Sequence, residues 1–313
     1  MILSLAPMEG ITGHVFRRVH AECFGALDCY YTPFLPPPRV GNRFGGKAFK
    51  EIDPANNQGL NVVPQLMSKN ADEFVWAAQV LADMGYREVN LNLGCPSGTV
   101  VAKGKGSGFL RNLDELEVFL RDVCERSPLP VSVKTRLGLE EPEEFARLLE
   151  IFGRYPVSLL IIHPRVRKDF YRHPVRMECF EQAVDTYPGP LCFNGGLVTP
   201  ADCARLASRF SQVDRVMIGQ GLLADPALVQ KAKGGPGAGR ETLRAFHDEL
   251  YHTYLEIFAS QRNTVFHMKE LWSYLGRLFQ GAEKALKQIR KAADSPTYES
   301  AVAQIFALPL RQD

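Results

Sequence analysis

Short apolar runs alternate with segments of helical spacing along most of the chain. The apolar runs are rich in Val, Ile and Leu and stop at turn-forming residues, which is typical of buried strands. The segments between them carry apolar residues three and four positions apart, which predicts amphipathic helices. The predicted strands are 3–8, 28–32, 61–66, 88–93, 131–134, 158–163, 191–194 and 215–218. The predicted helices are 15–19, 74–81, 113–124, 142–152, 178–184 and 200–207.

Eight repeats of strand and crossover predict an α/β fold, a (β/α)8 TIM barrel, followed by a C-terminal helical bundle. A doubly wound sheet fits less well because no glycine fingerprint opens the first helix. The glycine-rich segment 233–239 is typical of a flexible linker. After Glu241, the apolar residues within 246–257, 268–278 and 285–289 have the spacing of amphipathic helices. We therefore predict a catalytic barrel domain over 1–233, a linker over 234–240 and a helical domain over 241–313.

Composition narrows the class of protein. A chain of 313 residues that is 45% hydrophobic can bury one large core and still form a smaller second domain. No apolar run is long enough to span a bilayer, and the start of the sequence lacks signal-peptide features, so we expect a cytoplasmic protein without membrane contact. Seven scattered cysteines without CxxC spacing predict reduced thiols and no metal site. No obligatory protein partner is evident, so we expect a monomer.

The end of the fourth predicted strand carries a candidate catalytic thiol. Residues 90–100 read NLNLGCPSGTV, which places Cys95 between Gly94 and Pro96 where the strand breaks. The following segment 103–108 is too glycine-rich for regular structure, so we expect a mobile loop that begins at the thiol. A thiol with an ordinary pKa of ~8.5 is mostly protonated at neutral pH and can donate a proton. A buried structural thiol is the alternative.

Polar and glycine residues also follow the other predicted strands, at the end of the barrel where active sites lie. Glycine turns follow the seventh and eighth strands, where such barrels bind phosphate through backbone N–H groups; ordinary tight turns are the alternative. Lys134 and His163 suit the stabilisation of negative charge on a bound ring, although Lys134 alone could be a solvated strand end.

Several motifs occur together and in order: LAPMEG at 5–10, VPQL at 63–66, NLNLGCPSGTV, KGKGSGFL at 103–110, VSVKTRLG at 131–138, HPR at 163–165, NGG at 194–196 and MIGQG at 217–221. With them the whole chain resembles the tRNA-dihydrouridine synthases. The resemblance implies a flavin mononucleotide (FMN) in the barrel that is reduced by NADPH. It implies tRNA as the partner and the reduction of one specific D-loop uridine to 5,6-dihydrouridine.

The resemblance also implies roles for single residues. Hydride would pass from FMN to C6 of the uracil, and Cys95 would give a proton to C5 from the other face. Asn92 would orient the uracil, and Lys134 would stabilise the anion left on the flavin. The implied FMN contacts are Pro7, Met8, Glu9, Gln65, Lys134 and His163 for the ring side, and Asn194, Gly195, Gly196, Gly219, Gln220 and Gly221 for the phosphate.

A uracil in folded RNA must be turned out of its stack to reach a barrel, so basic surface is expected around the opening. Segments 165–176 and 261–293 are rich in Lys and Arg, and Lys284, Lys287 and Lys291 share one predicted helix face; a solvated face is the alternative. Phe34, Tyr171 and Lys269 are added by the resemblance. The predicted tRNA contacts are therefore Phe34, Asn92, Arg165, Tyr171, Lys269, Lys284, Lys287 and Lys291.

Three positions differ from the more common family motifs: Pro164 within HPRV, Gly196 after Asn-Gly, and Gln220 in place of an arginine near the phosphate. The chief alternative is an FMN barrel oxidoreductase acting on a free small molecule, similar to a dihydroorotate dehydrogenase, which needs no basic helical domain. A non-catalytic RNA-binding protein would not need Cys95, and an aldolase using Lys134 as a Schiff base leaves Cys95 without a role. The sequence does not specify which uridine is reduced, or whether NADPH is preferred to NADH.

Overall fold

The computed structural model describes residues 1–311, and its centre is one parallel sheet of nine strands in the order β3-β2-β1-β9-β8-β7-β6-β5-β4. The two end strands, β3 and β4, are separated only by Pro64, which lacks the N–H that a continuous ladder needs. They are two halves of one predicted strand, so the sheet closes on itself as a barrel. The strands are β1 (Ile2–Leu5), β2 (Cys29–Tyr31), β3 (Val62–Val63), β4 (Gln65–Leu66), β5 (Val89–Leu93), β6 (Val131–Arg136), β7 (Leu160–His163), β8 (Leu191–Asn194) and β9 (Arg215–Ile218).

The predicted α/β barrel is confirmed, and every predicted strand is present. The largest difference is in β1, which ends at Leu5 rather than at residue 8. Pro7 cannot donate to a ladder, and the Met8 carbonyl instead accepts the backbone N–H groups of Ile11 and Thr12 in a turn.

The chain divides into two compact units. The first comprises residues 1–7, 28–196 and 210–217, and the second comprises residues 8–27, 197–209 and 218–313. The predicted division into barrel, linker and helical domain follows chain order and stays a prediction, because these units are defined by packing.

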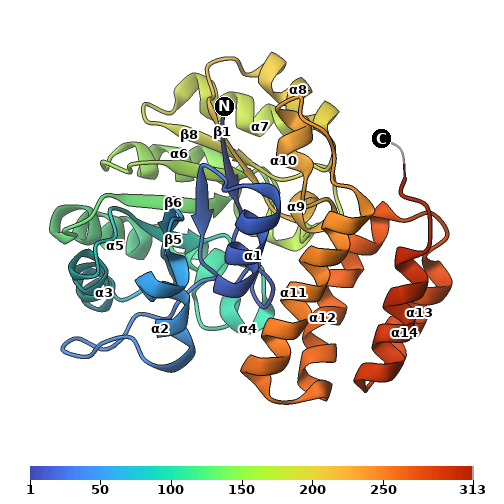
Figure 1. The fold of residues 1–313 in the computed structure, drawn as a ribbon. Helices are drawn as coiled ribbons and strands as arrows, with labels where there is room; N and C mark the ends of the chain where they lie inside the picture. The colour runs from blue at the N-terminus through green and yellow to red at the C-terminus, as the bar shows by residue number, and fades with distance from the viewer. Residues whose placement is uncertain (312–313) are drawn as a thin grey trace. The chain divides into compact units, whose positions relative to one another are not determined.

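Helices of the first unit lie outside the strands (Figure 1). Asn70 caps α3 by accepting from the Glu73 N–H, and Asn112 caps α5 by accepting from the Glu115 N–H. Their buried stripes meet where the rings of Phe74 and Phe119 pack edge to face at 5.8 Å. The helices are α2 (Gly46–Ile52), α3 (Ala71–Asp83), α4 (Gly98–Val101), α5 (Leu113–Arg126), α6 (Glu144–Gly153) and α7 (Met177–Thr186).

The second unit is helical. The Tyr298 hydroxyl on α14 connects three helices. It lies 2.7 Å from His247 Nε2 on α11 and accepts a hydrogen bond from the Trp272 indole N–H on α12 at 2.8 Å. Helices α2 and α4 of the first unit and α9, α10 and α14 of the second were not predicted. Asp294 caps α14, and its buried Tyr298, Ala301 and Val302 have helical spacing. The helices are α1 (His14–Phe24), α8 (Pro200–Arg209), α9 (Gln220–Ala224), α10 (Leu228–Ala232), α11 (Arg240–Phe258), α12 (Gln261–Leu275), α13 (Glu283–Lys291) and α14 (Ser295–Phe306).

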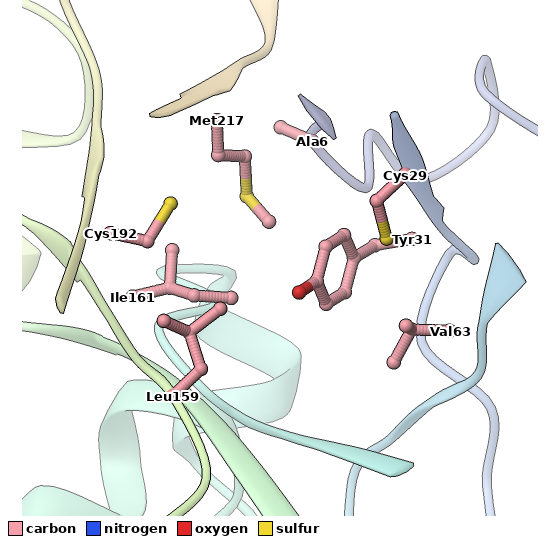
Figure 2. Packing of buried hydrophobic residues seen from close by; sticks show 8 residues of the cluster. All are labelled: Ala6, Cys29, Tyr31, Val63, Leu159, Ile161, Cys192 and Met217. Atoms are coloured by element: carbon pink, nitrogen blue, oxygen red, sulfur yellow. The ribbon is translucent and has the colours of Figure 1, made fainter. Parts of the chain in front are cut away.

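The first unit has an apolar core cluster formed by Ala6, Cys29, Tyr31, Val63, Leu159, Ile161, Cys192 and Met217. Figure 2 shows the Tyr31 hydroxyl pointing toward Ile161 and Leu159. Burial raises the pKa of Cys29 to about 12 and also raises that of Cys192, so both thiols stay protonated.

None of the seven cysteines forms a disulfide. The prediction that those other than Cys95 are core residues holds for Cys29, Cys192 and Cys203, which are buried. It is wrong for Cys23, Cys124 and Cys179, which keep part of their surface. No helix within residues 1–311 has the length and apolar character to cross a membrane.

Candidate active site

A hydrogen-bonded chain of two amide side chains and one serine hydroxyl crosses three neighbouring strands of the barrel. Gln65 on β4, Asn90 on β5 and Ser132 on β6 lie in register. Gln65 Nε2 donates to Asn90 Oδ1 at 2.8 Å, and Asn90 Nδ2 donates to Ser132 Oγ at 2.8 Å. All three side chains are fully buried, so these bonds satisfy groups that water cannot reach. The predicted contact of Gln65 with the flavin stays a prediction, and it requires a group that is buried in this structure.

Asn92 connects this amide chain to the candidate thiol. Its Nδ2 donates to Gln65 Oε1 at 2.6 Å, while its Oδ1 accepts the backbone N–H groups of Gly94 at 3.0 Å and Cys95 at 2.9 Å. Both lone pairs of Oδ1 are therefore used, and one amide N–H remains. Asn92 thus fixes the turn that places Cys95 at the end of β5; its predicted contact with uracil stays a prediction.

The expectation that segment 103–108 is too glycine-rich for regular structure holds for residues 103–105 and is wrong for residues 106–108, and the expected mobility of this loop stays a prediction. The segment after Cys95 forms α4 and a 3₁₀ turn (Gly106–Arg111) whose first five residues are buried. The Cys95 carbonyl accepts from the Ser107 N–H at 3.1 Å and from Ser107 Oγ at 2.8 Å. A Cβ on Gly106, at φ 55°, would lie 2.9 Å from Cys95 Cβ, and one on Gly108 would lie 2.6 Å from the Val101 carbonyl. These glycines permit close packing around the thiol.

Arg136, at the end of β6, ties the Cys95 turn to the loop that follows β7. It is 1% exposed. Its Nε donates to the Gly94 carbonyl at 2.9 Å, and its Nη1 donates to the carbonyls of Val166 at 3.2 Å and Phe170 at 2.9 Å. Its guanidinium carbon lies 5.3 Å from the centre of the Tyr171 ring. Sequence reasoning did not assign Arg136 a role, although its position at a strand end was a usable signal.

Lys134 and His163 carry unusual protonation properties. Burial, and then the charge of Arg136, lower the pKa of Lys134 to about 7. Burial, Arg136, Lys134 and Arg165 together lower the pKa of His163 well below its ordinary value, so this imidazole is neutral at neutral pH. Arg165 Nη1 lies 2.7 Å from His163 Nε2. Because a guanidinium only donates, we infer that Nε2 accepts and that Nδ1 carries the proton.

The basic segment 165–176 is less exposed than its sequence indicates. Arg165 is buried and donates to the His173 carbonyl as well as to His163. Asp169 is buried; burial alone would raise its pKa, but the ion pair with Arg176 lowers it. Lys168 forms an ion pair with Glu141 at 2.6 Å. Several charged side chains of this segment are therefore paired within the protein. A contact between Arg165 and tRNA stays a prediction.

The glycine turn after β8 fits a bound phosphate. Gly195 has φ 117°, and a Cβ on it would lie 2.7 Å from His163 Cδ2. Within residues 1–311, no protein acceptor takes the backbone N–H of Gly195 or Gly196. Asn194 Nδ2 donates to the Met217 carbonyl at 2.8 Å, which holds the turn against β9. Two available N–H groups in a glycine cradle are the donor set that a phosphate requires.

The second unit contains the remaining predicted cofactor residues except Pro7, which belongs to the first unit. Gly219 precedes α9, and a Cβ on Gly221 would lie 2.2 Å from the Leu197 carbonyl, so Gly221 is required by packing. Gln220 is partly exposed. Met8 N–H donates to Thr12 Oγ1 at 2.8 Å, and Glu9 is exposed.

The predicted RNA contacts of the second unit lie on α12 and α13. Lys269 Nζ lies 4.2 Å from the centre of the Phe266 ring. Lys284, Lys287 and Lys291 are exposed on α13 opposite its buried residues, as predicted from their spacing. In the part of the chain that the structure describes, none of these three lysines forms an ion pair. In the first unit, Phe34 is partly exposed and Tyr171 is exposed.

No group of three or more His, Cys, Asp or Glu side chains among residues 1–311 is arranged to hold a metal ion. The site is instead a set of hydrogen-bonding and cationic groups with one thiol, placed at the C-terminal ends of parallel strands. The fold and the position of this site are those of an α/β-barrel enzyme. The chain belongs to the dihydrouridine synthase (Dus) family, whose model matches residues 4–307.

Similar proteins agree with this membership. A probable tRNA-dihydrouridine synthase of Staphylococcus epidermidis is 30% identical over 233 residues, which cover 72% of this chain and 70% of the relative. A tRNA-dihydrouridine(16) synthase of Aquipseudomonas alcaligenes is 25% identical in an alignment that covers 97% of this chain and 99% of that protein.

Solved structures resemble the chain in fold. Morphinone reductase in complex with tetrahydroNAD has a TM-score of 0.51 at 14% identity, covering 78% of this chain and 90% of that one. A 2-naphthoyl-CoA reductase complex has a TM-score of 0.54 at 11% identity, covering 75% of this chain and 50% of that one. At such low identity these likenesses show the barrel fold alone.

Proposed function

We propose that this protein reduces a uridine in the D-loop of tRNA to 5,6-dihydrouridine, with FMN bound in the barrel and NADPH as the reductant. Members of the family are flavoenzymes, which supports the cofactor. The observation that carries the proposal is the fixed position of Cys95, whose backbone N–H is held by Asn92 at 2.9 Å at the end of β5.

Cys95 is the proposed proton donor. When bound, the flavin supplies the hydride that C6 of the uracil receives. Cys95 gives its thiol proton to C5 from the other face of the ring and takes a proton back from solvent after product release. The hydrogen bonds of Asn92 and Ser107 fix the backbone that carries this thiol, which favours proton transfer in a defined geometry.

Lys134 and His163 are proposed to face the flavin ring. With a pKa of about 7, Lys134 is partly protonated at neutral pH and its ammonium stabilises negative charge on the ring. The neutral His163 supplies a hydrogen bond without adding a charge, since its Nδ1 carries the proton. Asn194, Gly195 and Gly196 are proposed to bind the phosphate of FMN. A contact of Gly219, Gln220 and Gly221 with the same phosphate stays a prediction.

The Aquipseudomonas relative is named for position 16 of tRNA. We take position 16 as the first nucleotide to map in this protein. A cytoplasmic location and a monomeric state stay predictions.

The test begins with the purified protein. We expect a yellow protein with a flavin spectrum that NADPH bleaches, and that converts unmodified tRNA to a product in which reverse transcription maps dihydrouridine. Free uridine is the control, and we expect no turnover of it. A protein that neither carries nor accepts flavin, or that reduces free small molecules but leaves tRNA unchanged, contradicts the proposal.

A further inference from the structure

Phe170 has a backbone conformation that phenylalanine rarely adopts. Its φ is 50° and its ψ is −103°, and only Ala259 shares a positive φ among the non-glycine residues of 1–311. A Cβ is in steric conflict in this region, whereas glycine adopts it freely. The sequence therefore keeps a phenyl ring at a position where glycine would relieve the backbone.

Hydrogen bonds from buried groups hold this backbone. The Phe170 carbonyl accepts from Arg136 Nη1 at 2.9 Å, and the Phe170 N–H donates to the Arg167 carbonyl at 3.2 Å. The buried Asp169 carboxylate accepts the Val166 N–H at 3.1 Å and pairs with Arg176. The surrounding loop thus determines the strained conformation, and such strain is concentrated at functional sites.

Phe170 is one of the exposed large hydrophobic residues, with 39% of its surface in solvent. The Arg167 guanidinium carbon lies 5.5 Å from the centre of its ring. The neighbouring Tyr171 ring is 46% exposed, lies 5.3 Å from the Arg136 guanidinium carbon, and is 5.9 Å from the His163 ring. The loop therefore presents two exposed aromatic rings, each against an arginine, beside residues of the candidate active site.

We propose that Phe170, together with Tyr171, forms a stacking platform for the unpaired RNA bases that flank the reduced uridine. This inference rests on the proposed function. Unstacked bases bind proteins by stacking on aromatic rings, and such contacts tolerate any base because every base has a π-face. The contact of Tyr171 with tRNA follows the family pattern, and the role of Phe170 is the new element.

The charges around the two rings favour nucleic acid over an apolar protein partner. Arg172 is exposed next to them, and Arg167 keeps part of its surface. A strand whose bases stack on Phe170 and Tyr171 would bring its phosphates to these arginines. Because Arg136 bonds both the Phe170 carbonyl and the Gly94 carbonyl, the same side chain fixes the platform and the Cys95 turn.

The test uses two substitutions that suit a positive φ and remove the ring, Phe170→Gly and Phe170→Asn. We expect Phe170→Gly to unfold at a higher temperature than the wild type. We expect both variants to keep the flavin spectrum and its reduction by NADPH, and to raise the KM for tRNA by about 5- to 100-fold. Phe170→Trp keeps a stacking surface and should bind tRNA as tightly as the wild type.

A matched control is Phe49→Ala, which removes a phenylalanine that is 41% exposed on the regular helix α2 and should leave the KM unchanged. The salt dependence of tRNA affinity separates stacking from charge, because loss of an uncharged ring leaves its slope unchanged. If the wild type reduces tRNA while Phe170→Gly and Phe170→Asn retain its KM, the platform is refuted and the proposed function stands. If the wild type does not reduce tRNA, the proposed function itself fails.

Discussion

Polar side chains at the strand ends of the first unit and on the outer face of α13 in the second unit differ in burial and in hydrogen bonding. At the strand ends, side chains such as Asn92 and Arg136 are buried and bonded to several partners. On α13, the three lysines are exposed and form no ion pair within residues 1–311. Groups that position a reacting atom must be fixed, whereas lysines proposed to attract RNA phosphates can act while exposed to solvent. Substitutions at the strand ends should therefore change stability and kcat, whereas substitutions on α13 should change the affinity for tRNA.

The largest effect is expected at Cys95. Cys95→Ala should lower the rate of tRNA reduction by about 10²- to 10⁴-fold, because it removes the proposed general acid. The flavin spectrum and its reduction by NADPH should be retained, and single-turnover assays would separate the two steps. Cys179→Ala, which changes a partly exposed thiol on α7, is the matched control and should behave as the wild type. A Cys95→Ala enzyme with full tRNA turnover would exclude the thiol as proton donor.

The second effect concerns the positioning of the thiol. Asn92→Ala removes the acceptor for the Gly94 and Cys95 N–H groups and leaves Gln65 Oε1 without its donor. We expect a loss of about 2–4 kcal/mol in the free energy of unfolding, since buried groups lose their partners. We also expect kcat to fall by ~10- to 100-fold, because Cys95 is no longer held.

Asn70→Ala is the comparison for Asn92→Ala, since it removes an exposed amide that accepts one N–H at the start of α3. It should cost about 1 kcal/mol and leave kcat unchanged. Denaturant unfolding and steady-state kinetics measure both quantities. Equal losses of stability in the two variants would contradict the buried network.

The third effect is a pH dependence of stability. Lys134 has a pKa of about 7 in the folded protein against an ordinary value of 10.5, so between these values the unfolded chain binds more protons. The free energy of unfolding should then rise with pH across this window, by up to ~1.4 kcal/mol per pH unit. Lys134→Met should lose this contribution, and the exposed Lys287→Met should keep it. Denaturant titrations at pH 7 and pH 9 measure the difference, and parallel curves for wild type and Lys134→Met would contradict it.

The smallest effect is expected on α13. Lys287→Gln should lower tRNA affinity several-fold and reduce the slope of log affinity against log salt by about 1, because one phosphate contact is lost. kcat at saturating tRNA should not change. Lys168→Gln is the control, since Lys168 is already paired with Glu141 and should change the slope less. A change in kcat for Lys287→Gln would show that α13 affects chemistry as well as binding.

Local periodicity predicted most of the fold. The strands are recognisable because each is a short buried run, although the single predicted strand 61–66 is divided at Pro64 into β3 and β4. Helix α14 was missed although Tyr298, Ala301 and Val302 have helical spacing after the Asp294 cap. The short helices α9 and α10 lack enough turns to show a period, so sequence reasoning had little with which to detect them.

The sequence by itself determined the order of strands and helices and the chemistry at their ends, because strand and helix periods and strand-end positions are local properties. It placed Asn92, Cys95, Lys134 and His163 at strand ends. Only the tertiary structure decided which of these groups touch. Arg136 reaches the Gly94 carbonyl 42 positions away and the Phe170 carbonyl 34 positions away. Such contacts depend on how closed strands and their loops pack, which no local pattern encodes.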